Sequence, residues 1–215
     1  MKVFRGNILW VSVFAVVWWC GCVQVFAQPS SPHTPPQASH GLQVLVTYHS
    51  LSGHTAEMAK AVKKGAESVK GTTVLLKTVG QVTADELFGS DAVIVGSPVY
   101  WSNMSGEVKS FFDRWQFEFG VFPEWKMRDK VGAAFATGGQ VSSGKEVTML
   151  TILAAMLGNK MIVVSDGGAF GASATTEGDS PGINDVERAD AWALGKRVAE
   201  VAGMIKRGQL LPGQP

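Results

Sequence analysis

The chain has 215 residues, and 46% of them are hydrophobic, which is enough for the core of one domain with an appendage. Its formal net charge of +1 gives no strongly basic surface, so we expect no nucleic-acid partner. Both cysteines, Cys20 and Cys22, precede the region expected to fold, which excludes a disulfide framework and thiol catalysis from that region.

The N-terminus has the pattern of a targeting segment. Lys2 and Arg5 supply a positive region, and the run from Ile8 to Cys20 is almost wholly apolar. Val25-Phe26-Ala27 then offers small or medium side chains where a signal peptidase cleaves, so cleavage is expected before Gln28. This pattern predicts export, to the periplasm or out of the cell.

Two other fates of residues 1–27 stay open. The apolar run is just long enough to remain as a membrane anchor, and Gly21-Cys22 resembles part of a lipoprotein cleavage site. Either would tether the chain to a membrane outside the cytoplasm. Residues 28–40 are rich in Pro and Ser and are expected to form a linker. Residues 41–208 are then the folded domain, and residues 209–215 a flexible tail.

Within the domain, strand and helix patterns alternate. Strands are expected from residue 44 onward and at residues 73–77, 92–96, 131–136 and 161–164. Helices are expected at residues 53–70, 85–88, 105–115, 145–157 and 184–208, the last opening with a capping pair of Asn184 and Glu187. The expected buried positions are Ala59, Val62, Ala66 and Val69, then Val108, Phe111, Phe112 and Trp115, and then Val147, Leu150, Ala154 and Leu157. This alternation predicts an α/β fold with a doubly wound, five-stranded parallel sheet.

The loop after the first strand predicts a phosphate-binding turn. Its residues are Ser50, Leu51, Ser52, Gly53, His54 and Thr55. A helix follows, and the amides and dipole at a helix N-terminus favour an anion. The turn has no Lys or Arg, and the P-loop pattern does not occur, which argues against a nucleoside triphosphate with Mg²⁺. The glycine pattern of dinucleotide-binding proteins does not occur either, which argues against a dinucleotide. A single terminal phosphate, as in flavin mononucleotide (FMN), fits this turn; an ordinary turn with a Ser or Thr cap is the alternative.

Two further loops should lie beside this turn, because ligands of such sheets bind beyond the carboxyl ends of the strands. Their candidate residues are Pro98, Val99, Tyr100, Trp101 and Ser102 after the third strand, and Thr137, Gly138 and Gly139 after the fourth. The two aromatic rings suit stacking on a flat flavin ring, and the glycines allow close backbone approach. Packing under a loop is the alternative for both rings.

Taken together, these loops resemble the flavodoxin-like family, and within it the NAD(P)H:quinone reductases of the tryptophan-repressor-binding-protein type. The likeness is carried by Ser50-x-x-Gly53-His54-Thr55, Gly96-Ser97-Pro98, Asn103-Met104-Ser105-Gly106, Phe111-Phe112-Asp113, Thr137-Gly138-Gly139 and Phe170-Gly171-Ala172-Ser173. It implies strand order 2-1-3-4-5, bound FMN, NADH or NADPH as electron donor and a quinone as acceptor. The turn at residues 50–55 would hold the phosphate, and residues 98–102 and 137–139 the isoalloxazine. A homodimer or homotetramer is also implied.

The chain departs from that family at two places. A His pair expected before the fifth strand is replaced by Leu157-Gly158-Asn159-Lys160, and Tyr100-Trp101 stands where the reductases have Arg-Phe. The acceptor is therefore a quinone or a similar small molecule, and no catalytic residue is assigned. His54 has no partner at ligand spacing, so no metal is expected. An electron carrier without NAD(P)H activity and a flavin-free tethered domain remain the alternative functions.

Overall fold

The computed structural model describes residues 41–176 and 182–209. Our expectations of a signal peptide or anchor and of a linker lie outside the described residues, as does residue 210 onward. Gln209, where we expected the tail to begin, still belongs to the last helix. None of the helices in the two described ranges combines the length and apolar character needed to cross a membrane.

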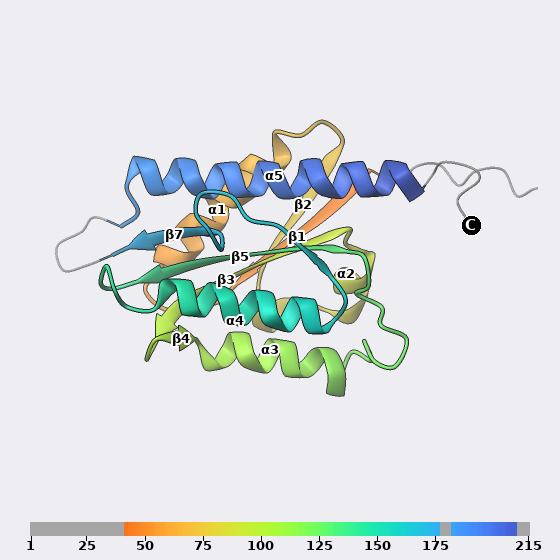
Figure 1. Ribbon diagram of the computed structural model, residues 1–215, viewed down its shortest axis with the longest axis horizontal. Coiled ribbons are helices and arrows are strands. Elements are labelled where there is room, and N and C mark those ends of the chain that lie inside the picture. Colours follow the sequence, from red (N-terminus) through yellow and green to blue (C-terminus); the bar gives the residue numbers. More distant parts are fainter. Residues whose placement is uncertain (1–40, 177–181, 210–215) are drawn as a thin grey trace, which may run out of the picture. The chain divides into compact units, whose positions relative to one another are not determined.

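A parallel sheet forms the centre of the domain (Figure 1). Its main path runs β2-β1-β3-β5-β6, and every neighbouring pair along it is parallel. These strands are β1 (Leu42–Tyr48), β2 (Thr72–Thr78), β3 (Ala92–Tyr100), β5 (Val131–Gly138) and β6 (Ile162–Val163). Counted along the chain, this is the order 2-1-3-4-5, so the predicted α/β topology is confirmed.

The fifth strand is split rather than continuous. β6 has only two residues, and the chain returns to β5 farther along as β7 (Ala172–Thr175). We expected one strand over residues 161–164. The apolar run there gave no sign of a second strand, because Gly171-Ala172-Ser173-Ala174 has little β propensity of its own. Pairing with β5 makes it a strand.

The third strand is longer than expected. β3 continues through Pro98 to Tyr100 and turns back into β4 (Asn103–Met104), which pairs with it antiparallel. The sequence pattern predicts a loop at residues 98–100, because Gly96 and Pro98 interrupt the apolar run. Pairing of Pro98 with Thr137 on β5 keeps this segment in the sheet.

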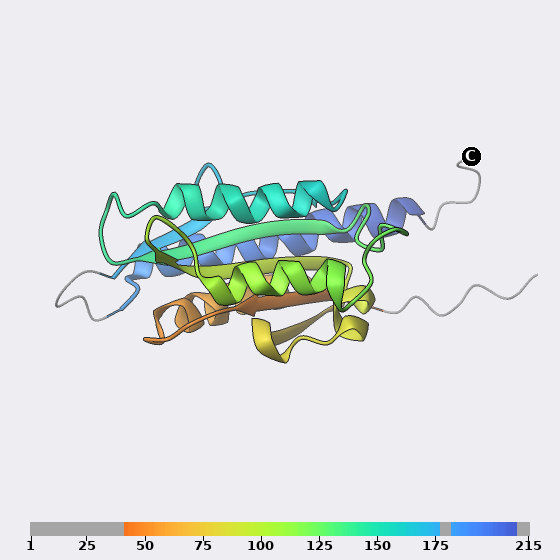
Figure 2. The same ribbon diagram turned by 90° about the horizontal axis from the view of Figure 1, so that it is seen from below.

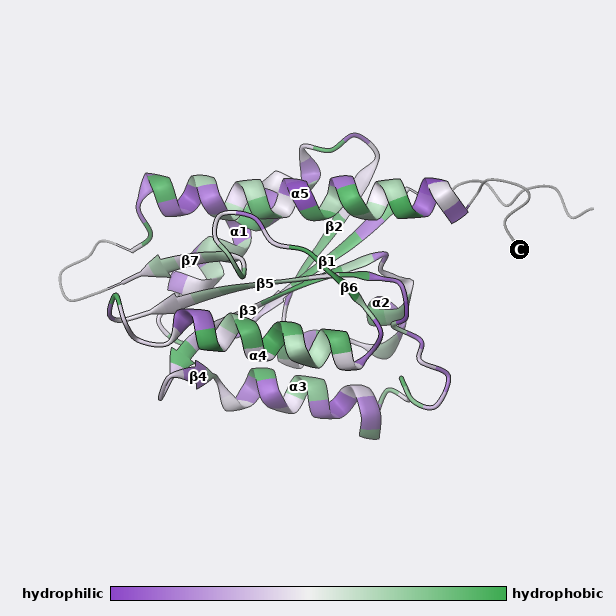
Figure 3. Cartoon of the chain, viewed as in Figure 1, coloured by the Kyte–Doolittle hydropathy of each residue, from purple (hydrophilic) through white to green (hydrophobic). Residues whose placement is uncertain are grey.

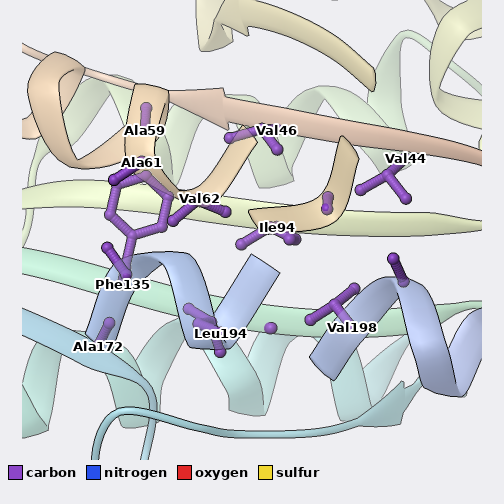
Figure 4. Packing of buried hydrophobic residues seen from close by; sticks show 14 of the residues in the cluster. Val44, Val46, Ala59, Ala61, Val62, Ile94, Phe135, Ala172, Leu194 and Val198 are labelled. Atoms are coloured by element: carbon purple, nitrogen blue, oxygen red, sulfur yellow. The ribbon is translucent and has the colours of Figure 1, made fainter. Parts of the chain in front are cut away.

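Helices cover both faces of the sheet (Figures 1 and 2). One face carries α1 (His54–Glu67) and α5 (Asp185–Gln209). The other carries the 3₁₀ helix η1 (Val79–Gln81), α2 (Ala84–Gly89), α3 (Gly106–Phe117) and α4 (Lys145–Gly158). Side chains of β1 alternate between the two cores: Val44 and Val46 face α1 and α5, while Leu45 faces the other layer. Figure 4 shows the first core, where Phe135, Leu194 and Val62 pack together.

Most predicted helix faces are confirmed. Ala59, Val62 and Ala66 are fully buried in α1, although Val69 lies beyond its end, and the four positions of α3 are buried. The capping pair is also present: Glu187 N donates to Asn184 Oδ1 at 2.9 Å, and Asn184 N donates to Glu187 Oε2 at 2.9 Å.

The predicted buried face of α4 is wrong. Met149, Ile152 and Met156 point into the core, whereas Val147, Leu150 and Leu157 are about half exposed. Ala154 is also exposed. Residues 147–157 contain no charged side chain, and Figure 3 shows α4 apolar along most of its length. Apolar spacing alone therefore fits more than one face of this helix.

Candidate functional site

Three segments meet at the carboxyl edge of the sheet, where β1, β3 and β5 end. Thr55 Oγ1 lies 2.7 Å from Thr137 Oγ1, and both side chains are buried, so the turn after β1 is joined directly to the end of β5. His49 N donates to Gly96 O at 3.2 Å, which joins the end of β1 to β3. The structure thus brings together the three segments that the sequence singled out.

The turn at residues 50–55 leaves the start of α1 open. Gly53 precedes the helix with φ at 94°, and none of the described side chains caps α1. The alternative of an ordinary Ser or Thr cap is therefore wrong. Gly53 N donates to Ser50 Oγ at 3.1 Å, and Ser52 Oγ lies 3.1 Å from His54 Nδ1. Uncapped amides and nearby hydroxyls form a donor set suited to a phosphate.

The second segment is the tight turn between β3 and β4. Trp101 and Ser102 both have positive φ, at 50° and 63°, as a two-residue hairpin turn of this hand requires. Non-glycine residues rarely adopt this conformation, and it holds the Trp101 ring fully outside the protein. Tyr100 is partly exposed and meets the His49 ring edge-on, with centroids 6.0 Å apart. Core packing of both rings is thus excluded, and they form a rim. Pro98 and Val99 lie half-buried before them.

The third segment begins at the end of β5. Thr137 is buried, and Gly138 lies so close to the following loop that a Cβ there would be 2.1 Å from Ser143 Oγ. Gly139 is exposed, with open space where its Cβ would be. Lys145, at the start of α4, is buried beside this loop, and no sequence pattern singled it out.

These residues fit FMN on a further observation. The Ser143 hydroxyl is buried against Gly138 of the third segment, and the Thr47 hydroxyl is buried near the carboxyl end of β1; neither has a hydrogen-bond partner among the described residues. A buried hydroxyl without a partner costs about 1–3 kcal/mol, so such groups are usually satisfied by a ligand or water. Polar atoms of a bound ligand could meet this need. The uncapped α1 suits its phosphate and the aromatic rim its flat ring.

His49 was not interpreted from sequence and lies beside this site. Its Nδ1 is 3.0 Å from Ser105 Oγ and 3.3 Å from Glu107 Oε2, which fixes the ring orientation. The ring lines an open cavity of about 590 Å³ together with Phe111 and Arg114. Nothing in the sequence indicated that His49 lies at this site, because its contacts are with Ser105 and Glu107, which are far away in the sequence. Across the described residues no three His, Cys, Asp or Glu side chains gather as metal ligands.

Comparisons with known proteins agree with this geometry. A family profile described as "NADPH-dependent FMN reductase" matches residues 77–176. The chain is 30% identical over 207 residues to "NAD(P)H dehydrogenase (quinone) 3" of Rhizobium meliloti, covering 78% of this chain and 95% of that protein. It is also 30% identical over 169 residues to a protein named "Flavodoxin" from Clostridium saccharobutylicum, covering 76% of this chain and 99% of that one.

Solved structures show the same fold. A WrbA-like flavodoxin from Agrobacterium tumefaciens superimposes with a TM-score of 0.66 at 28% identity, over 76% of this chain and 99% of that chain. A flavodoxin from the domain Archaea gives a TM-score of 0.60 at 24% identity, over 75% and 99% of the two chains.

Proposed function

Because the chain belongs to the flavodoxin-like family of NAD(P)H dehydrogenases (quinone), we propose that it binds FMN and transfers two electrons from NADH or NADPH to a quinone or similar small acceptor. One observation supports this most: an uncapped helix start, an aromatic rim and a glycine loop converge at one sheet edge.

Different residues at this sheet edge would bind the phosphate and the ring of FMN. The amides at the start of α1 and the hydroxyls of Ser50, Ser52 and Thr55 hold the phosphate. The hydrogen bond between Thr55 and Thr137 keeps that turn in register with the loop beside the ring. Residues 98–102 and 137–139 flank the ring, and Trp101 offers an exposed stacking face. Bound FMN would supply the two-electron chemistry that links the nicotinamide donor to the acceptor.

The rim favours a small acceptor over a protein partner. Neither residues 99–106 nor residues 137–144 include a charged side chain. Electron carriers usually steer toward their partners with a surface of one charge sign, because complementary charge raises encounter rates. A neutral aromatic rim instead suits a flat apolar molecule. The relative named flavodoxin keeps a carrier as the second candidate.

Anaerobic reduction separates the two functions. We expect purified protein to be yellow or to become yellow with FMN, and the bound flavin to bleach within seconds of adding NADH or NADPH. Benzoquinone should restore the colour, and free FMN under the same conditions is the control. A bound flavin that neither nucleotide reduces would make the protein a carrier. Protein that is still colourless once unbound FMN has been removed would support the remaining alternative, a domain that binds no flavin.

We also propose that the mature chain lies outside the cytoplasm, either released or tethered through residues 1–27. Support comes from the charged start, the apolar run and the cleavage pattern ending at Ala27. An N-terminal sequence beginning at Gln28 is expected, and a lipid on Cys22 would select the lipoprotein form. A full-length cytosolic chain that begins at Met1 would contradict the proposal.

For the quaternary structure we propose a homodimer or homotetramer in which α4 of one copy meets α4 of another. Val147, Leu150 and Leu157 expose apolar side chains there, and residues 147–157 carry no charge that would repel a second copy. A helix that is apolar on all sides is normally buried on all sides. Leu150→Glu should lower the mass measured by light scattering, and an unchanged mass would exclude this face.

A further inference from the structure

Lys145 is a buried cation that has no ion-pair partner among residues 41–176 and 182–209. Its side chain is 4% exposed, and no other charged residue in the described ranges is as deeply buried. Nζ donates to Gln140 O at 3.1 Å, to Val141 O at 3.2 Å and to Thr175 Oγ1 at 2.6 Å. These three neutral acceptors use all three ammonium hydrogens. Within the described residues, no carboxylate oxygen lies within 4.0 Å of Nζ.

The position of Lys145 in α4 adds to the free-energy cost of burying its positive charge. Lys145 is the first residue of the helix, at the end where the helix dipole is positive and where acidic side chains are favoured. No described side chain caps α4, because Gly144 precedes it with φ at 96°. A buried ion normally needs a partner of opposite charge. The start of α4 therefore holds a buried positive charge, whereas the acidic residue of its first turn, Glu146, is exposed.

The two segments that we propose to flank the flavin ring, residues 98–102 and 137–139, both lie close to the start of α4. The aliphatic stem of Lys145 lies against Gly138, since a Cβ on Gly138 would be 3.0 Å from Lys145 Cγ. A Cβ on Gly144 would be 2.8 Å from Ser102 Cα, so the start of α4 also abuts the turn of the β3–β4 hairpin. The Lys145 ammonium is thus bonded to the two residues that follow residues 137–139, and the helix that carries it begins against the turn of the β3–β4 hairpin.

We infer that the positive charge of Lys145 raises the reduction potential of bound FMN by stabilising its reduced form. The inference rests on the proposed binding of FMN. A hydride from NAD(P)H carries two electrons and one proton, so its transfer leaves NAD(P)⁺ and turns the neutral oxidised ring into an anion. A fixed cation in a site of low dielectric favours that anion over the oxidised ring.

Replacing Lys145 by methionine removes the charge and keeps a long apolar stem. We expect Lys145→Met to lower the affinity for reduced FMN relative to oxidised FMN by about tenfold, which corresponds to a fall of about 30 mV in the two-electron midpoint potential. The potential is measured by equilibration with reference dyes, and oxidised FMN affinity by fluorescence titration. Lys109→Met, at an exposed position of α3, is the matched control and should shift neither value.

A charge-retaining variant separates electrostatics from loop positioning. Lys145→Arg should keep the wild-type potential even if the affinities for both forms of FMN fall together. If Lys145→Met does not fold, Lys145→Gln carries the same comparison, because its amide can still donate to the two carbonyls. A neutral variant with the wild-type potential would overturn the inference. Failure of the wild-type protein to bind FMN would instead refute the proposed function.

Discussion

At the scale of single residues, Gly53 shows how the phosphate turn depends on backbone conformation. Its φ of 94° is strained for any β-branched residue, but open space surrounds the position where a Cβ would stand. Gly53→Val should therefore act through backbone strain and not through a clash. Left-handed strain costs about 1–3 kcal/mol, so we expect the Kd for FMN to rise about tenfold in fluorescence titration.

Asparagine at the same position is the control, because it tolerates positive φ better than other non-glycine residues. Gly53→Asn should bind FMN more tightly than Gly53→Val. Equal binding by the valine variant and the wild-type protein would show that the phosphate does not use this turn.

The pair Lys77–Glu86 predicts a pH dependence of stability. The hydrogen bond from Lys77 lowers the pKa of Glu86 below its usual value, and the backbone amide of Thr83, which donates to Oε2 at 3.0 Å, lowers it further. A lowered pKa in the folded state gives stability above the unfolded-state pKa, and this stability is lost as the pH falls through the folded-state value. Glu86→Gln should unfold at lower urea than wild type at neutral pH, and this difference should shrink in acid.

The partner residue provides a check on the cause. In a Lys77→Met background, Glu86→Gln should change the urea midpoint less at neutral pH than it does in the wild-type protein. A difference between wild type and Glu86→Gln that stays constant down to a pH of about 3 would exclude the assigned pair.

Residues of the site differ in how far sequence could predict them. The turn at residues 50–55 could be predicted from its neighbouring hydroxyl side chains and its glycine, and the structure places it at the expected sheet edge. Lys145 and His49 could not be assigned, because each has a side-chain partner that is distant in the sequence: Thr175 is 30 residues from Lys145, and Ser105 is 56 residues from His49. Contacts of that kind exist only once the chain has folded.

At the scale of elements, α1 and α5 cross at a pair of glycines. A Cβ on Gly195 would be 1.9 Å from Val62 O, and a Cβ on Gly65 would be 1.8 Å from Trp192 O. Backbone atoms cannot move aside as a side chain can, so Gly195→Ala must push the two helices apart. We expect it to lower the unfolding free energy by about 1–3 kcal/mol in urea denaturation.

Gly203, in the same helix, is the matched control. A Cβ there meets only the end of the flexible Arg207 side chain, at 3.2 Å. Gly203→Ala should be neutral or stabilising by up to about 1 kcal/mol, because alanine favours helix. Equal effects of the two substitutions would show that helix propensity, and not the crossing, decides the outcome.

The existence of the elements was easier to predict than their ends and faces. α3 was readable because charged residues flank a clear apolar stripe, whereas α4 has no charged residue from 147 to 157 to mark its outer side. β3 and β7 owe their extents to pairing with β5, which lies elsewhere in the sequence. Tertiary pairing overrides local preference at such places.

At the scale of the whole molecule, two features were predicted on different grounds. The order of the strands was implied by the resemblance to the flavodoxin-like family. The helical layers on a central sheet were predicted from the alternation of strand and helix patterns along the chain. Strands and helices that alternate along a chain can build only a few sheet topologies, because crossovers are right-handed and connections short. The order along the sheet is not contained in that rule. The loop motifs supplied it through the family that they resemble.

The last prediction concerns which part of the chain is sufficient for binding. The sheet, both cores and all three flavin segments lie within residues 41–209. Leu42 N donates to Gly71 O at 2.9 Å, and Lys206 Nζ donates to Gly41 O at 3.3 Å, so the described fold is tied from its first residues. A chain that starts at Gly41 should therefore fold and bind FMN with a Kd within about twofold of the longer chain. A chain that starts at Tyr48 lacks most of β1 and should not fold. Weaker FMN binding or a lower Tm for the chain from Gly41 would show that residues 1–40 contribute to the domain.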